Sequence, residues 1–71
     1  MTCEEFTSAL LDCFRAADLR HGVGQWQERW RPLNLAIREK YEPGQLISIE
    51  FHDVPPKAYA ELLAAFKLAF T

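Results

Sequence analysis

Apolar residues recur at helical spacing over the first part of the chain. Between residues 3 and 21 they recur at positions i, i+4, i+7, i+8 and i+11 and form one face of a helix: Phe6, Leu10, Cys13, Phe14 and Ala17. Thr2 and Glu5 have the spacing of a capping box, in which each residue's side chain accepts the other's backbone N–H. Gly22 or Gly24 is typical of the position just after a helix. The pattern predicts a helix over residues 3–21.

A second apolar stripe runs from Trp26 to Tyr41, but it contains Pro32. Proline removes one helical hydrogen bond, clashes with the preceding turn and disfavours the α conformation of the residue before it. The pattern therefore favours a short helix over 25–30 and a second helix that starts with Pro32 and ends at Tyr41. A continuous, kinked helix is the alternative.

Residues 45–51 alternate between two faces with a period of two, which is typical of a β-strand. Pro43-Gly44 before this segment favours a turn, and Pro55-Pro56 after it favours the start of a helix. No second segment of similar quality is present, and an isolated strand leaves its backbone groups unpaired. We therefore expect strand 46–51 to pair with another chain. The partner strand belongs either to a second copy, antiparallel across a two-fold axis near Ser48 and Ile49, or to a target protein.

The last predicted helix, residues 57–70, is apolar around almost its whole circumference, with only Lys57, Glu61 and Lys67 polar. Such a helix is normally covered on more than one side. We expect the preceding helices to cover one broad face, so that the remaining apolar surface indicates a second chain. The predicted fold is mainly α with a minor β part: one domain over residues 1–71, with three to four helical segments and one short strand.

Composition narrows the class of protein. The chain has 71 residues and a net charge of −2, so neither a bulk polyanion binder nor a disordered chain is indicated. Cys3 and Cys13 lie too far apart on one helix to form a disulfide with each other, which favours free thiols in a reducing compartment. The acidic opening residues lack the basic part of a signal peptide, and no apolar run is long enough to span a membrane. We expect a cytoplasmic protein that does not interact with membranes.

Catalytic chemistry finds little support in the sequence. In His52-Asp53 a histidine stands beside a carboxylate, but neighbours on an extended segment point to opposite sides, and Asp53 suits a helix cap. The cysteines and histidines lack the spacing of a metal site, and no phosphate-binding or nucleophile motif is present. We predict no enzyme activity, no metal, no cofactor and no small-molecule substrate.

The sequence instead favours a small intracellular protein-interaction module that forms a homodimer and acts as an adaptor, inhibitor or regulator of a larger protein. The residues predicted to bind a second copy or a target lie on the strand and the last helix: Leu46, Ile47, Ser48, Ile49, Phe51, Tyr59, Leu63, Phe66 and Phe70.

The alternative is a nucleic-acid-binding regulator that uses the basic segment 15–41. Its candidate patch, which would bind an anion or alternatively a protein partner, comprises Arg20, Arg29, Arg31, Arg38 and Lys40. Trp26 and Trp30 could stack on bases, but their spacing fits the apolar stripe, which favours a place in the core.

Overall fold

Three helices make up most of the protein. The computed structural model describes residues 1–44 and 54–70, and it contains α1 (Cys3–His21), α2 (Gln27–Tyr41) and α3 (Tyr59–Phe70). The one-turn 3₁₀ helix η2 (Pro56–Ala58) leads directly into α3. The predicted mainly helical class is confirmed, and no strand occurs within the two described ranges. The predicted strand 46–51 and its pairing lie outside them.

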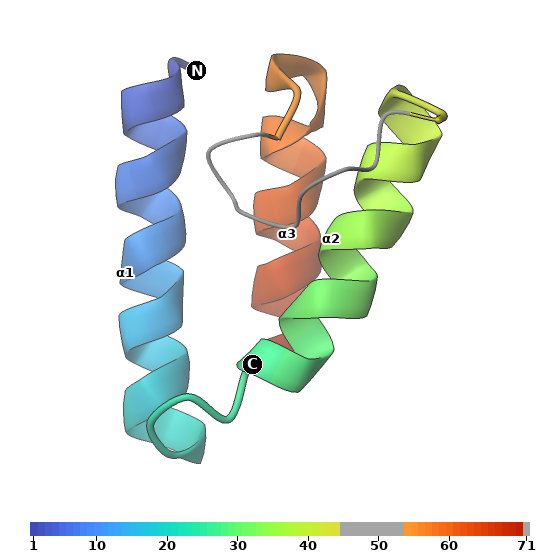
Figure 1. The fold of residues 1–71 in the computed structure, drawn as a ribbon. Helices are drawn as coiled ribbons and strands as arrows, with labels where there is room; N and C mark the ends of the chain where they lie inside the picture. The colour runs from blue at the N-terminus through green and yellow to red at the C-terminus, as the bar shows by residue number, and fades with distance from the viewer. Residues whose placement is uncertain (45–53, 71) are drawn as a thin grey trace.

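Helix α3 lies between the other two helices, with α1 on one side and α2 on the other (Figure 1). It runs parallel to α1, since Phe6 stacks on Tyr59 where both helices begin and His21 meets Phe70 where both end. It runs antiparallel to α2, whose last residue, Tyr41, bonds to Glu61 near the start of α3. The central position of α3 explains its apolar sequence, because two helices cover it on two sides.

Both ends of α1 follow the local signals in the sequence. The Glu5 N–H donates to Thr2 Oγ1 at 3.1 Å, and the Thr2 N–H donates to Glu5 Oε1 at 3.0 Å. The bond from the Thr2 N–H favours the ionised carboxylate, and it is the main reason that the pKa of Glu5 lies below its ordinary value. At the other end Gly22 adopts a φ of 103°, which residues with a side chain rarely reach, and its N–H donates to the Asp18 carbonyl. The predicted helix 3–21 and its capping box are confirmed.

Helix α2 continues through Pro32, so the predicted break into two helices is wrong and the continuous alternative holds. Its start is also two residues later than predicted, at Gln27 instead of Gln25. Because proline has no N–H, the Glu28 carbonyl loses its hydrogen bond within the helix. Glu28 is exposed, so water can solvate this carbonyl. Trp30 and Ile37, on either side of Pro32, are both buried in the core. Tertiary packing on both sides therefore outweighs the local penalty of the proline.

The core is aromatic and centres on the meeting of all three helices. Phe66 is 1% exposed and lies edge-on to Phe14 and Trp30, with ring centroids 5.0 and 5.9 Å apart. Phe14 also stacks face to face on Trp26 at 3.9 Å. Such rings bury large apolar areas, which a chain of this size needs in order to fold alone.

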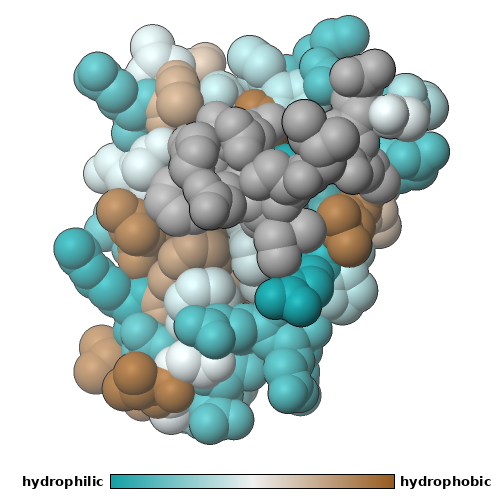
Figure 2. Space-filling model, in the orientation of Figure 1, coloured by the Kyte–Doolittle hydropathy of each residue, from teal (hydrophilic) through white to brown (hydrophobic). Residues whose placement is uncertain are grey.

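The expectation that only one broad face of α3 is covered needs correction, because α1 and α2 flank it on two sides. The apolar surface that remains on this helix is smaller than its sequence suggests. It consists of alanines such as Ala60 and Ala64, together with Leu68, which is 82% exposed. On the face shown in Figure 2, apolar atoms also gather over the C-terminal end of α1, at the lower left.

Candidate protein-binding surface

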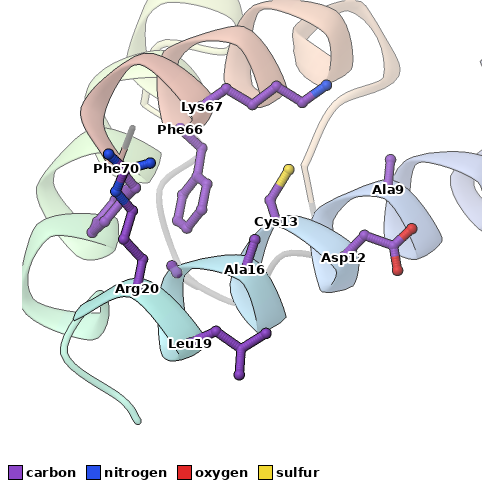
Figure 3. Close-up of a pocket in the computed structure, with 10 residues that line it drawn as sticks. Ala9, Asp12, Cys13, Ala16, Leu19, Arg20, Phe66, Lys67 and Phe70 are labelled. Carbon is purple, nitrogen blue, oxygen red and sulfur yellow. The ribbon is translucent and has the colours of Figure 1, made fainter. Parts of the chain in front are cut away.

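An open groove of about 680 Å³ lies between α1 and α3 (Figure 3). Its apolar floor includes Ala9, Cys13 and Ala16 from α1 together with Phe66 and Phe70 from α3. The three α1 residues are four and three positions apart, so they share one face of the helix. Their short side chains leave the space that larger residues would fill. The floor is therefore apolar, shallow and accessible to a side chain from outside.

The rim of the groove carries charges and one exposed leucine. Leu19 is 90% exposed and projects away from α3, whereas Lys67 extends along the α3 side (Figure 3). Asp12 and Arg20 lie one turn before and one turn after Ala16 on α1. An apolar floor with a charged rim is the usual arrangement of a protein-binding surface.

The Cys13 thiol faces this groove but is poorly suited to nucleophilic chemistry. Burial raises the pKa of Cys13 above its ordinary value; Asp12 raises this pKa further, and Lys67 opposes the rise. The thiol is therefore protonated at neutral pH, and the thiolate is the reactive form. We interpret Cys13 as part of the apolar floor.

Asp18 fixes the turn that follows the groove-lining part of α1. Its Oδ1 atom accepts the Gly24 N–H at 2.8 Å and the Trp26 indole N–H at 2.7 Å. The same residue's carbonyl accepts the Gly22 N–H at 2.9 Å. These three bonds, which we call the Asp18 clamp, hold Trp26 so that its ring stacks on Phe14.

The C-terminal end of α3 is also held in place beside the groove. His21 Nε2 lies 3.0 Å from the Phe70 carbonyl oxygen, so a protonated Nε2 donates to a carbonyl that the end of the helix leaves without an internal partner. The Arg29 guanidinium lies 5.8 Å from the centre of the Phe70 ring, within range of a cation–π contact. Contacts from α1 and α2 thus hold Phe70, and with it the α3 part of the groove floor.

The predicted partner-binding residues do not form one exposed surface in the described part of the chain. Tyr59, Leu63, Phe66 and Phe70 are between 1% and 7% exposed and pack within the chain's own core. Of these four, Phe66 and Phe70 also reach the floor of the groove. The remaining predicted residues, Leu46, Ile47, Ser48, Ile49 and Phe51, lie outside the described residues, as do His52 and Asp53.

The predicted anion-binding residues are not equivalent. Arg20, Arg29 and Arg31 are exposed, but Arg38 is only 4% exposed and its Nε donates to Asn34 Oδ1 at 3.1 Å. Lys40 is exposed and forms an ion pair of 2.9 Å with Glu61. The structure does not bring these five cations together as one exposed patch.

Neither tryptophan is presented for base stacking. Trp30 is 7% exposed, and one face of the Trp26 ring is stacked on Phe14 while its N–H is bonded to Asp18. Both rings serve the packing of α2, as the apolar stripe indicates.

Glu61 joins α3 to the end of α2. Its carboxylate accepts hydrogen bonds from the Tyr41 hydroxyl and from Lys40 Nζ. The bond from Tyr41, followed by that from Lys40, holds the pKa of Glu61 below its ordinary value, and the same contacts with Glu61 raise the pKa of Lys40 and of Tyr41. The network lies away from the groove, and we interpret it as structural.

Other site types find no support in the described residues. Residues 1–44 and 54–70 contain no cluster of His, Cys, Asp or Glu that could hold a metal ion. No helix in these two ranges combines the length and apolar character needed to cross a membrane.

Comparisons of the chain with protein-family models, with curated proteins and with solved structures gave no match.

The groove itself is absent from the sequence-based prediction. Its α1 side follows a second stripe, Ala9, Asp12, Ala16 and Leu19, with the spacing three, four and three. That spacing is typical of a helix–helix seam, but alanines and an aspartate make it less conspicuous than the neighbouring stripe of phenylalanines and leucines. A search for a second helical stripe beside the core stripe could have found it.

Proposed function

We propose that this chain is a small protein-interaction module that acts as an adaptor or inhibitor of a larger protein, with the groove between α1 and α3 as its binding surface. The single observation that carries the proposal is the exposure of Leu19, which is 90% accessible on the rim of an apolar groove. Both cysteines are free thiols, a state that the reducing interior of a cell preserves.

Leu19 is not needed for the core of this chain. The buried cluster is continuous from Phe6 at one end to Phe70 at the other without it. A large aliphatic residue beside a hollow apolar floor gains about 1.5–3 kcal/mol when a partner removes it fully from water. Association with another protein accounts for both the leucine and the hollow.

The shape of the groove favours a helix as the binding element. Ala9 and Ala16 allow a second helix backbone to approach closely, as small residues do at helix–helix contacts. An amphipathic helix would place its apolar residues on the floor and its polar residues toward Asp12, Arg20 and Lys67. Such recognition requires no chemistry from the chain beyond the shape and charge of its surface.

Differential capture from the native cell tests the function. Tagged wild-type protein, a Leu19→Asp variant and an Arg31→Asp control are compared, because Arg31 is exposed on α2 outside the groove. We expect one target to be retained by the wild type and the control and lost with Leu19→Asp, and the purified target to reproduce this order in calorimetry. Equal retention by all three proteins, with intact helix content, would show that the groove is not the binding surface.

A further inference from the structure

The groove face of α1 is complementary to itself in an antiparallel arrangement. Ala16 lies near the middle of this face, with Asp12 four residues before it and Arg20 four residues after it. If two copies of α1 cross antiparallel with Ala16 beside a two-fold axis, Asp12 of each copy lies opposite Arg20 of the other. The arrangement therefore makes two symmetric pairs of opposite charge.

The apolar residues match in the same register. Cys13 and Leu19 each lie three residues from Ala16, on opposite sides of it. Leu19, 90% exposed, therefore comes to lie over the half-buried Cys13 of the second copy, where the floor is hollow. One register thus places a large residue opposite small ones and an acid opposite a base, and its two-fold symmetry closes the assembly at two chains.

We propose that the occupant of the groove in the target-free protein is α1 of a second copy, in an antiparallel homodimer with Ala16 at the two-fold axis. This inference rests on the proposed function, because it takes the same groove as the association surface and names what fills it. Ala9 and Ala16 on the seam permit the short distance between helix axes that close antiparallel packing requires, about 8 Å. A target helix then competes with the second copy for the groove.

The dimer predicts a specific rescue between two charge reversals. Asp12→Arg and Arg20→Asp each place like charges opposite one another twice, whereas the combined variant restores opposite charges in both pairs. Asp12 is 72% exposed and its contact with Arg15, at 3.8 Å, is a weak surface ion pair within the same helix. The Asp12→Arg change therefore costs the isolated helix little.

Sedimentation equilibrium over a range of protein concentrations measures the effect. We expect the wild type to be dimeric at tens of micromolar, each single reversal to raise the dimer Kd about tenfold or more, and the double variant to return to within about threefold of the wild type. Leu19→Asp should be monomeric, and Arg31→Asp, the same charge change as Arg20→Asp but on α2, should be dimeric. Circular dichroism of each variant checks that the helices are retained.

Three outcomes would overturn the inference: a monomeric wild type, a Leu19→Asp variant that is still dimeric, or a double variant no stronger than the single reversals. The outcomes also separate this inference from the proposed function. A monomeric wild type whose target capture depends on Leu19 overturns the homodimer and leaves the proposed function standing. A dimer restored by the double reversal supports this inference, even when target capture proves independent of Leu19 and the proposed function fails.

Discussion

The Asp18 clamp makes a quantitative prediction about the stability of the fold. Asp18→Ala removes the carboxylate that accepts the Gly24 N–H at 2.8 Å and the Trp26 indole N–H at 2.7 Å. A hydrogen bond to a charged group contributes about 1.5–3 kcal/mol, and half-buried bonds fall at the low end because water partly replaces the lost acceptor. We expect Asp18→Ala to lower the free energy of unfolding by about 2–3 kcal/mol. A chain of this length has roughly 4–10 kcal/mol in total, so the loss is a large fraction of its stability.

A double-mutant cycle isolates the side-chain part of this clamp. Trp26→Phe keeps an aromatic ring against Phe14 but removes the indole donor, and Asp18→Asn keeps an oxygen acceptor without the charge. Urea unfolding followed by far-UV circular dichroism gives the stability of each variant without relying on tryptophan fluorescence. We expect a coupling energy of about 1–2 kcal/mol between Asp18→Ala and Trp26→Phe, and a loss for Asp18→Asn between zero and that of Asp18→Ala. A coupling energy near zero would show that Asp18 and Trp26 contribute independently and that their hydrogen bond does not stabilise the fold.

Three further variants test other parts of the structure. Leu10→Ala removes a side chain that is 0% exposed and should destabilise the fold by about 2–5 kcal/mol in urea unfolding; a loss below about 0.5 kcal/mol would contradict the position of this residue in the core. Because the folded-state pKa of Glu61 lies below its ordinary value of 4.5, the stabilisation it provides is present above that value and is lost as the pH falls through the folded pKa. Tyr41→Phe removes the largest cause of that shift, so this variant should lose less stability than the wild type between about pH 7 and pH 3, and an equal or larger loss would argue against the Tyr41 bond. The Arg29→Ala/Arg31→Ala variant should change the affinity for single-stranded DNA less than about threefold, and steeply salt-dependent binding by the wild type that the variant loses would instead support the nucleic-acid alternative.

The elements that the sequence predicts well are those fixed by short-range signals. The capping box of Thr2 and Glu5, the glycine after His21 and the apolar stripe from Phe6 to Ala17 all act within a few residues, and α1 has the predicted bounds. The final helix likewise lies where its periodicity places it, with its first turn tightened to a 3₁₀ helix before Tyr59.

The sequence-based predictions fail where contacts between residues far apart in the chain determine the structure. The penalty at Pro32 is local, but Trp30 and Ile37 are held in a core formed largely by residues of the other helices. The Asp18 clamp depends on a side chain that reaches across a turn, which helical periodicity does not reveal. The apolar circumference of α3 reflects its place between α1 and α2, and the order of elements along the chain does not show which helix is central.

The sequence suggests a protein-binding surface, but it does not show which residues form the candidate surface. Unused apolar surface is visible in the sequence, and it led to the last helix, whose large residues Tyr59, Leu63, Phe66 and Phe70 are buried within the chain. The exposed leucine beside the groove belongs to α1 instead. Only the packing of α1 against α3 shows that the seam from Ala9 to Leu19 lies beside the core and borders a hollow.

Disulfide trapping across the proposed two-fold axis tests whether two copies of this protein associate through the groove face of α1. Ala16→Cys is introduced into a chain with Cys3→Ser and Cys13→Ser, and Arg31→Cys in the same background serves as the control on α2. We expect mild oxidation at tens of micromolar protein to link two copies through residue 16, the control to remain unlinked, and the addition of Leu19→Asp to abolish the link. Equal cross-linking of the two cysteine variants, or none with Ala16→Cys, would contradict the claim that the groove face of α1 is where this protein associates.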